Sequence, residues 1–190
     1  MKSLYFATSN KWKFAQAKGY FADKGIVLKQ FEVDLPESRS EEVLEIAREK
    51  ARAAFTKLKK PLFVIDGALH IKALNDFPKT YVKFIDKYLG AEGLLKLLEG
   101  EKNRNWEFVN LLFYKDRSQE KNFPGVLRGE VALKIRSQHN NFVRDFDRIL
   151  FPEGKNKTYG EMSVEEVKKF NNEVWQPTVF DKFIKWFKNI

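Results

Sequence analysis

Three places in the sequence combine residue types that could bind or react with a phosphate group. The first is the run Thr8-Ser9-Asn10-Lys11-Trp12-Lys13, which follows a short apolar stretch. Short polar side chains, backbone N–H groups at the start of a helix and lysines together make an anion site. A capped helix with solvated lysines is the alternative explanation of the same residues. Thr8, Asn10 and Lys13 are therefore candidates for binding phosphate.

Two carboxylates, Glu37 and Asp66, could bind a metal ion beside such a site. Each of them follows a predicted strand. Mg²⁺ in proteins takes one or two carboxylates together with substrate phosphates and waters. Because ligands of open α/β sheets bind at the carboxyl ends of strands, we expect both side chains at the same sheet edge as Thr8. The alternative is that both are turn residues, since Asp-Gly is a common turn dipeptide.

Lys50 is a further candidate for phosphate binding. It lies one turn after Ile46 and one turn before Ala54, at the flank of the apolar face of a predicted helix. A lysine at such a flank can extend its charged end into solvent or point it into a cleft. Both alternatives agree with the spacing.

The elements that would position these residues alternate between strand and helix. Apolar runs predict strands over 4–7, 26–33 and 62–65, the last ending at Asp66-Gly67. Helical spacing of apolar residues predicts a helix after Asn10 and another opened by Ser38, which forms a capping box with Glu41. This alternation is typical of an α/β domain.

The rest of the chain predicts an antiparallel addition to this sheet. Residues 80–98 have the pattern of two helices interrupted at Gly90. Stretches over 108–114 and 126–135 predict a hairpin of two long strands, with a charged turn near 115–121. Ser163 and Glu166 form a second capping box, and Pro177 separates that helix from a final amphipathic one. The expected result is a mixed β-sheet with helices on both sides.

Composition limits the class of protein. The 190 residues correspond to one domain, at roughly 100–200 residues per domain, and 43% of them are hydrophobic, which provides a core. The absence of cysteine excludes disulfides and thiol catalysis. No apolar run approaches the length of about 18 residues that suggests a membrane span, and the first residues do not resemble a signal peptide, so we expect a cytoplasmic protein. The net charge of +9 favours anionic partners such as nucleotides.

Taken in order, these motifs resemble the inosine triphosphate pyrophosphatase family over nearly the whole chain. The matching segments are Thr8-x-Asn10-x-x-Lys13, Asp34-Leu35-Pro36-Glu37 and residues 45–50, 73–84, 146–147, 151–154 and 157–162. The resemblance implies an elongated α/β fold, in which a long mixed sheet and its flanking helices form two lobes around a central cleft, with residues 1–190 as a single domain. It also implies a homodimer that hydrolyses deaminated purine nucleoside triphosphates, such as those of inosine and xanthosine, to the monophosphate and pyrophosphate.

The same resemblance assigns roles to the candidate residues. The residues expected to hold the triphosphate are Thr8, Asn10, Lys13 and Lys50. The residues expected to bind Mg²⁺ are Glu37 and Asp66, of which Asp66 is also expected to orient the attacking water. The residues expected to contact the base are Phe146 by stacking, Asp147 as a hydrogen-bond acceptor, and Lys168.

The chain departs from the family pattern at specific points. The family has two adjacent acidic residues where this chain has Ile65-Asp66. Its glycines on either side of Pro78 are replaced by Asn75-Asp76 and Lys79. The aromatic-Asp-Pro of its base loop reads 146–148, Phe-Asp-Arg, and its Ser-His-Arg, which helps recognise a 6-oxo purine, aligns with Asn171-Asn172-Glu173. The loss of an arginine donor and the gain of an acidic acceptor predict an altered choice of base.

Two other functions stay open from the sequence. One is a catalytically inactive member of the family that binds a nucleotide as a sensor or scaffold, because Ile65 replaces an acidic residue. The other is nucleic-acid binding, suggested by the net charge and by Lys57-Leu58-Lys59-Lys60. A run of charges is more often a solvated face, so we expect no nucleic-acid partner.

Overall fold

The computed structural model describes residues 3–36, 38–137 and 144–190, with only the backbone at residue 12. The strands and helices in chain order are β1 (Ser3–Ala7), α1 (Lys11–Ala22), β2 (Val27–Phe31), α2 (Val43–Leu58), β3 (Leu62–Ile71), η1 (Lys72–Leu74), β4 (Pro78–Lys79), α3 (Val82–Tyr88), α4 (Gly90–Leu97), β5 (Asn105–Lys115), β6 (Glu120–Val131), η2 (Asp145–Arg148), β7 (Leu150–Pro152), η3 (Tyr159–Glu161), α5 (Val164–Phe170), the π-helical turn η4 (Asn171–Trp175) and α6 (Gln176–Lys188). The chain divides into two compact units. The first unit contains Met1–Asp66, Asn110–Gly125 and Asn172–Ile190, and the second contains Gly67–Val109 and Val126–Asn171.

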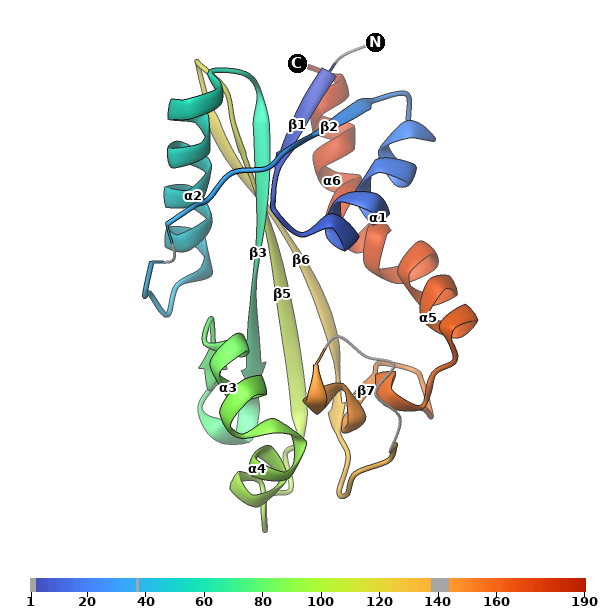
Figure 1. The fold of residues 1–190 in the computed structure, drawn as a ribbon. Coiled ribbons are helices and arrows are strands. Elements are labelled where there is room, and N and C mark those ends of the chain that lie inside the picture. Colours follow the sequence, from blue (N-terminus) through green and yellow to red (C-terminus); the bar gives the residue numbers. More distant parts are fainter. Residues whose placement is uncertain (1–2, 37, 138–143) are drawn as a thin grey trace. The chain divides into compact units, whose positions relative to one another are not determined.

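Seven strands in the described part of the chain belong to one sheet with the order β2-β1-β3-β5-β6-β7, and β4 pairs with β3 (Figure 1). β1 pairs in parallel with β2 and with β3, whereas β3–β4 and β6–β7 are antiparallel. In the β1–β3 pair, Tyr5 is opposite Leu62 and Phe6 is opposite Phe63. The prediction of a mixed sheet flanked by helices is confirmed.

In the first unit, helices cover both faces of the sheet (Figure 1). α2 packs on one face through three fully buried alanines, Ala47, Ala51 and Ala54. α1 and α6 cover the other face with aromatic side chains, where the ring of Phe21 lies 5.6 Å from that of Phe63 and 5.0 Å from that of Phe180. Small residues on α2 allow the helix to lie close to the strands, and the burial of large rings on the opposite face stabilises the unit.

The start of α2 and the end of β3 differ from the expectation. α2 begins at Val43 rather than at Ser38, because the Ser38 hydroxyl donates to the Glu49 side chain instead of capping a helix. β3 continues through Asp66-Gly67 to Ile71, so this dipeptide is not a turn. A Cβ at Gly67 would lie 2.6 Å from the ring of Phe108. The glycine therefore provides room for an aromatic neighbour.

The β5–β6 hairpin is tighter than the predicted charged turn over 115–121. The carboxylate of Asp116 accepts hydrogen bonds of 2.8 Å from the backbone N–H groups of Ser118 and Gln119. These bonds close the turn in a few residues, so β6 begins at Glu120 and ends at Val131 instead of spanning 126–135.

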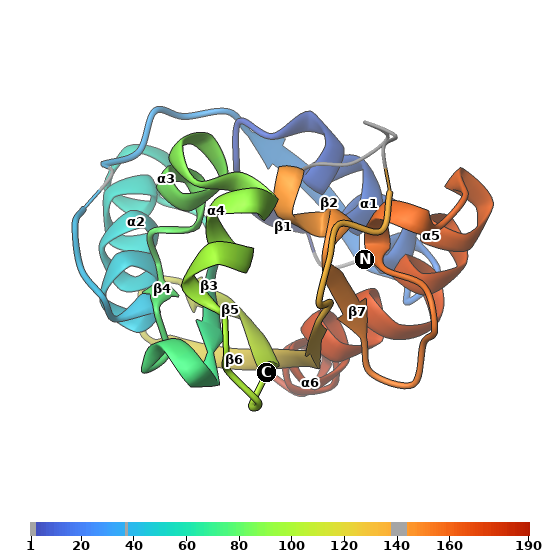
Figure 2. The ribbon, with the colours of Figure 1, turned by 90° about the horizontal axis from the view of Figure 1, so that it is seen from below.

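The second unit confirms the helix interruption predicted at Gly90. α3 ends at Tyr88 and α4 begins at Gly90, which has a φ of +58°. A Cβ on Gly90 would lie 2.5 Å from the Oδ2 atom of Asp145. That oxygen accepts a 2.7 Å hydrogen bond from the N–H of Ala91 and so ties α4 to η2, the orange turn beside it in Figure 2.

The C-terminal helices are joined by a π-helical turn. The capping box of Ser163 and Glu166 opens α5 as predicted. The separation expected at Pro177 is wrong, because α5 passes through η4 directly into α6 and Pro177 lies in the first turn of α6. Proline fits there, since the first N–H groups of a helix have no intrahelical partner.

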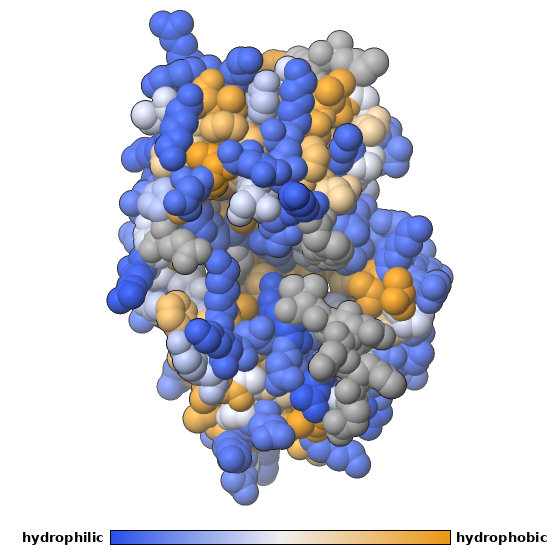
Figure 3. Space-filling view, viewed as in Figure 1, coloured by the Kyte–Doolittle hydropathy of each residue, from blue (hydrophilic) through white to orange (hydrophobic). Residues whose placement is uncertain are grey.

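The surface is mainly polar. The face shown in Figure 3 is largely hydrophilic, with hydrophobic residues in separate patches. Within the residues that the structure describes, no helix combines the length and apolar character needed to cross a membrane.

Candidate functional site

The turn between β1 and α1 is held by its own polar side chains. Thr8 Oγ1 accepts a 3.1 Å hydrogen bond from Asn10 N, and Asn10 Oδ1 accepts a 2.9 Å bond from Lys13 N as the N-cap of α1. The cap expected for the start of this helix is therefore present, and phosphate binding by the turn stays a prediction. Capping leaves the positive end of the helix dipole and the lysines in place, so an anion can still be attracted to this turn.

The sheet brings this turn close to Asp66. Thr8 directly follows β1, and its N–H donates to Phe31 O at the end of β2. Continuing the register in which Phe6 is opposite Phe63 brings Thr8 level with Ile65, one residue before Asp66. Neighbouring strands are about 5 Å apart. The register therefore places Thr8, just beyond the end of β1, near the level of Asp66 on β3.

Lys50 and Asp66 form an ion pair in this region. Lys50 Nζ lies 2.8 Å from Asp66 Oδ2 and donates a 3.1 Å hydrogen bond to Asp66 Oδ1. The side chains are 20% and 22% exposed. The charged end of Lys50 therefore points to a carboxylate, and the alternative of a lysine extending into solvent is wrong.

Asp66 is one of the two predicted metal ligands. Its Oδ2 atom is buried and receives no hydrogen bond, because the close contact with Lys50 lacks hydrogen-bond geometry. Glu37, the other predicted ligand, lies outside the described residues. Among residues 3–36, 38–137 and 144–190 there is no group of three or more acidic or histidine side chains that could hold a metal by themselves. A single carboxylate that shares the ion with phosphate and water fits Mg²⁺.

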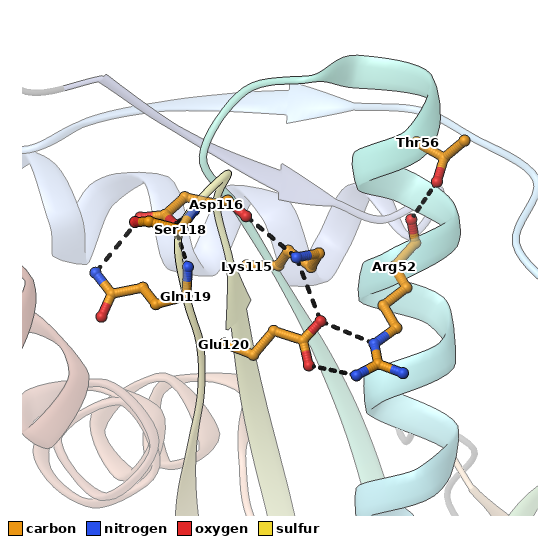
Figure 4. Close-up of polar contacts among 7 residues, drawn as sticks. All are labelled: Arg52, Thr56, Lys115, Asp116, Ser118, Gln119 and Glu120. Atoms are coloured by element: carbon orange, nitrogen blue, oxygen red, sulfur yellow. Dashed lines mark hydrogen bonds and ion pairs between the residues drawn. The ribbon is translucent and has the colours of Figure 1, made fainter.

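The helix that carries Lys50 is also anchored to the β5–β6 hairpin (Figure 4). Arg52 makes two 2.8 Å hydrogen bonds to the carboxylate of Glu120, and Lys115 lies 3.3 Å from the same carboxylate. The hydrogen bond from Arg52, together with Lys115, lowers the pKa of Glu120 below its usual value despite partial burial. Sequence reasoning missed this pair, because 68 residues separate its members.

The residues predicted to contact the base lie in the second unit. Phe146 is fully buried, and Asp147 is 8% exposed. Burial raises the pKa of Asp147 to about 6, although the charge of Arg144 and a hydrogen bond from its N–H oppose this. The guanidinium of Arg144, another residue that sequence reasoning missed, lies 4.7 Å from the ring centre of Phe108 and 5.7 Å from that of Phe146. Stacking of Phe146 on a base stays a prediction, and it requires exposure of this ring.

The remaining base-side residues lie on the C-terminal helices. Lys168 is an exposed residue of α5. Asn171, Asn172 and Glu173, aligned with the family's Ser-His-Arg, form the start of the π-helical turn η4, with Asn171 buried and the other two exposed. Such π-turns are rare and frequently occur at functional sites.

The segment between η1 and α3 contains several residues with a left-handed backbone conformation. Asn75, Asp76 and Lys79 have φ values of +52°, +66° and +53°. These are the three positions at which the family pattern has glycine. The left-handed conformation that glycine adopts readily is therefore present here with other side chains.

Comparisons with known proteins agree with this fold and identify its family. The family model described as Ham1 family matches residues 4–173. The dITP/XTP pyrophosphatase of Methanopyrus kandleri is 37% identical over 190 residues, covering 100% of this chain and 97% of the relative. The fold is similar to that of a HAM1 protein from Coxiella burnetii, with a TM-score of 0.83, 20% identity and 100% of both chains covered. It is also similar to the Ham1 protein of Staphylococcus aureus, with a TM-score of 0.80, 23% identity and 99% of both chains covered. Since the model spans most of the chain and a relative matches it end to end, the resemblance seen in the sequence is confirmed, and this chain belongs to the Ham1 family.

Proposed function

We propose that this chain hydrolyses nucleoside triphosphates to the monophosphate and pyrophosphate, and is thus a hydrolase that acts on acid anhydrides. The observation that carries the proposal is the Lys50–Asp66 pair next to the Thr8–Lys13 turn, in a member of the Ham1 family. In the reaction, water adds to the α-phosphorus, the α–β anhydride bond breaks, and pyrophosphate leaves. The name of the Methanopyrus kandleri relative supports this class of substrate.

The first unit supplies the groups for the phosphates. The α1 N-terminus and Lys13 attract the anionic chain, with Thr8 and Asn10 fixing the shape of the turn. Lys50 moves its ammonium from Asp66 to a phosphate oxygen. The freed Asp66 carboxylate can then accept a hydrogen bond from the attacking water and hold it in line.

Asp66, with Glu37, would also hold the divalent metal, which we propose to be Mg²⁺. When bound, such an ion neutralises phosphate oxygens and stabilises the charge of the leaving group. The Asp66 carboxylate is partly buried and has the flexible Lys50 side chain as its partner, which supports this assignment.

On the base side we propose an altered choice of base, with Phe146, Asp147 and Lys168 as the contacts. At neutral pH most Asp147 side chains are ionised, because their pKa is about 6, and a carboxylate can accept from an N–H group of a base. The exposed Glu173 adds a second acceptor where the family pattern has an arginine donor. A homodimer and a cytoplasmic location stay predictions.

The test is pyrophosphate release with Mg²⁺ across standard and deaminated nucleoside triphosphates. We expect turnover of at least one nucleotide and a loss of about 100-fold or more in Asp66→Asn. Asp23→Asn, which removes an exposed carboxylate at the end of α1, is the matched control and should leave the rate unchanged.

Two outcomes would contradict the proposal. Unchanged turnover in Asp66→Asn would remove Asp66 from the reaction. Nucleotide binding by the folded protein without release of pyrophosphate from any member of the panel would favour the inactive sensor or scaffold.

A further inference from the structure

Lys50 contacts the two carboxylate oxygens through which Asp66 could bind a metal ion. Its ammonium contacts both carboxylate oxygens, at 2.8 and 3.1 Å. A Mg²⁺ ion bound to either oxygen would lie about 2.0–2.1 Å from it. A dication and an ammonium that share one carboxylate at these distances repel each other strongly, because neither is screened fully by water. Metal binding at Asp66 and the observed position of Lys50 therefore oppose each other.

We propose that Lys50 is an exchangeable counter-ion of Asp66, which disfavours binding of a divalent metal until a triphosphate draws the ammonium away. This inference rests on the proposed function, since it assigns an order of events to the same site. Its consequence is that metal and triphosphate promote each other's binding, whereas metal alone binds poorly.

The contacts of the pair favour exchange. The ammonium lies 2.8 Å from Oδ2 and donates one hydrogen bond, of 3.1 Å, to Oδ1. Both side chains are about one fifth exposed, so part of the pair is in contact with solvent. A lysine ammonium is a compact charge on a flexible stem, so it can change partner without a shift of the backbone.

The surroundings of the pair limit movement to the Lys50 side chain. α2 is fixed by its buried alanines on the sheet and by the paired hydrogen bonds between Arg52 and Glu120 (Figure 4). Asp66 lies within the continuous strand β3. The new partner is expected nearby, because the register of β1 and β3 brings the Thr8 turn level with Ile65.

The thermodynamic consequence is a coupling between the two ligands. If triphosphate raises the affinity for metal by some factor, metal must raise the affinity for triphosphate by the same factor. Removal of the ammonium should separate these effects. A variant without it should bind metal more tightly in the absence of nucleotide and gain less from adding nucleotide.

The experiment measures Mn²⁺ binding to the nucleotide-free protein by electron paramagnetic resonance, with Mn²⁺ as a visible substitute for Mg²⁺. We expect Lys50→Gln to bind Mn²⁺ at least tenfold more tightly than the unmodified protein. The double variant Lys50→Gln/Asp66→Asn should lose this gain. Arg48→Gln is the matched control, because it removes a cation from the same helix two residues earlier, and its Mn²⁺ affinity should stay within about twofold of the unmodified protein.

A second arm repeats the titration at saturating inosine triphosphate with a non-hydrolysable α,β-imido bridge. The analogue should raise the Mn²⁺ affinity of the unmodified protein more than that of Lys50→Gln. Lys50→Met, which keeps an aliphatic side chain, replaces Lys50→Gln if circular dichroism shows that the latter is unfolded.

The inference is overturned if neither Lys50 variant binds Mn²⁺ more tightly than the unmodified protein, or if the double variant keeps the gain. Failure of the proposed function has a different signature, since it is measured by pyrophosphate release from the unmodified protein. Turnover with unchanged Mn²⁺ affinity in the Lys50 variants would overturn the exchange alone. Tighter Mn²⁺ binding without turnover would overturn the hydrolase assignment and leave the competition for Asp66 in place.

Discussion

Replacement of the buried Asp147 by asparagine should stabilise the protein in a strongly pH-dependent way. Burial raises the pKa of this carboxyl from 3.8 to about 6, against the opposing charge of Arg144. At about 1.4 kcal/mol per pH unit, ionising the side chain in the folded protein costs about 3 kcal/mol. Because the pKa in the folded state is the higher one, the neutral carboxyl of Asp147 does not reduce stability below about pH 4. The cost of ionising it in the folded protein appears as the pH rises to about 6.

The amide side chain introduced by Asp147→Asn would stay neutral at every pH and could still accept the 3.2 Å hydrogen bond that the N–H of Arg144 donates to Asp147. The free energy of unfolding of Asp147→Asn minus that of the unmodified protein should therefore rise by about 2.4 kcal/mol between pH 4 and pH 8. Urea unfolding at a series of pH values measures this difference.

Asp145→Asn provides the matched control in the same turn. Burial alone would raise the pKa of Asp145, but hydrogen bonds from Ala91 and Arg148 hold it below its usual value. Asp145 is therefore ionised in both states above about pH 5, and the effect of its replacement should be flat from pH 5 to pH 8. A flat profile for Asp147→Asn as well would refute the assignment of a raised pKa to Asp147.

Three further substitutions test particular features of the fold. Lys79→Gly should raise the free energy of unfolding by about 0.5–1 kcal/mol, because a left-handed backbone costs a non-glycine residue about 1–2 kcal/mol, and the greater entropy of glycine in the unfolded chain offsets part of the gain. In thermal unfolding, Lys79→Ala should show no increase, and an equal increase would exclude backbone strain as the cause. Asn110→Leu should stabilise by about 1 kcal/mol in urea unfolding, because the Nδ2 atom of Asn110 is buried and no described residue accepts a hydrogen bond from it; a loss of stability would mean that the amide is engaged. Glu120→Gln should cost less than about 1 kcal/mol, because Arg52 is largely exposed, and the cost should fall in high salt; a cost unaffected by salt would contradict an electrostatic origin.

Local signals in the sequence predicted the structure where the partners of a residue are near it in the chain. Asn10 caps α1 through a residue three positions away, and Ser163 caps α5 in the same manner. Gly90 interrupts α3 and α4 at a position that requires a positive φ. In each case the conformation depends on a few neighbouring residues, and these are visible in the sequence.

Sequence patterns were insufficient where a residue distant in the chain determines the local structure. Ser38 and Glu41 have the spacing of a capping box, but the Ser38 hydroxyl donates to Glu49 and the helix begins later. Asp66-Gly67 has the composition of a turn, but the ring of Phe108 needs the space beside Gly67 and the strand continues. These contacts form only in the folded chain, so local spacing cannot distinguish the two outcomes.

The same distinction applies to the candidate site. The N-cap role of Asn10 followed from local spacing, whereas the direction of Lys50 depends on Asp66, sixteen residues away on another element. The burial of Phe146 and Asp147 could not be predicted from their types, because Phe is common in cores whereas Asp is mostly exposed. Chemical type identified the candidates, and tertiary structure determines how accessible and how strongly charged each one is.

The departures from the family pattern therefore have unequal consequences. At Asn75, Asp76 and Lys79 the side chains differ from glycine, but the backbone keeps the positive φ that glycine would adopt, so the local path of the chain is retained at a cost in stability. At Ile65 the strand is also retained, but a carboxylate is replaced by an aliphatic side chain packed against the core of the first unit. The replacement at Ile65 removes a negative charge from β3, where Asp66 is the carboxylate that remains. In the absence of ligand, Lys50 neutralises the charge of Asp66. A change in reaction rate should therefore be sought at Ile65 and a change in base preference at Asn172 and Glu173, where exposed side chains replace the family's donors.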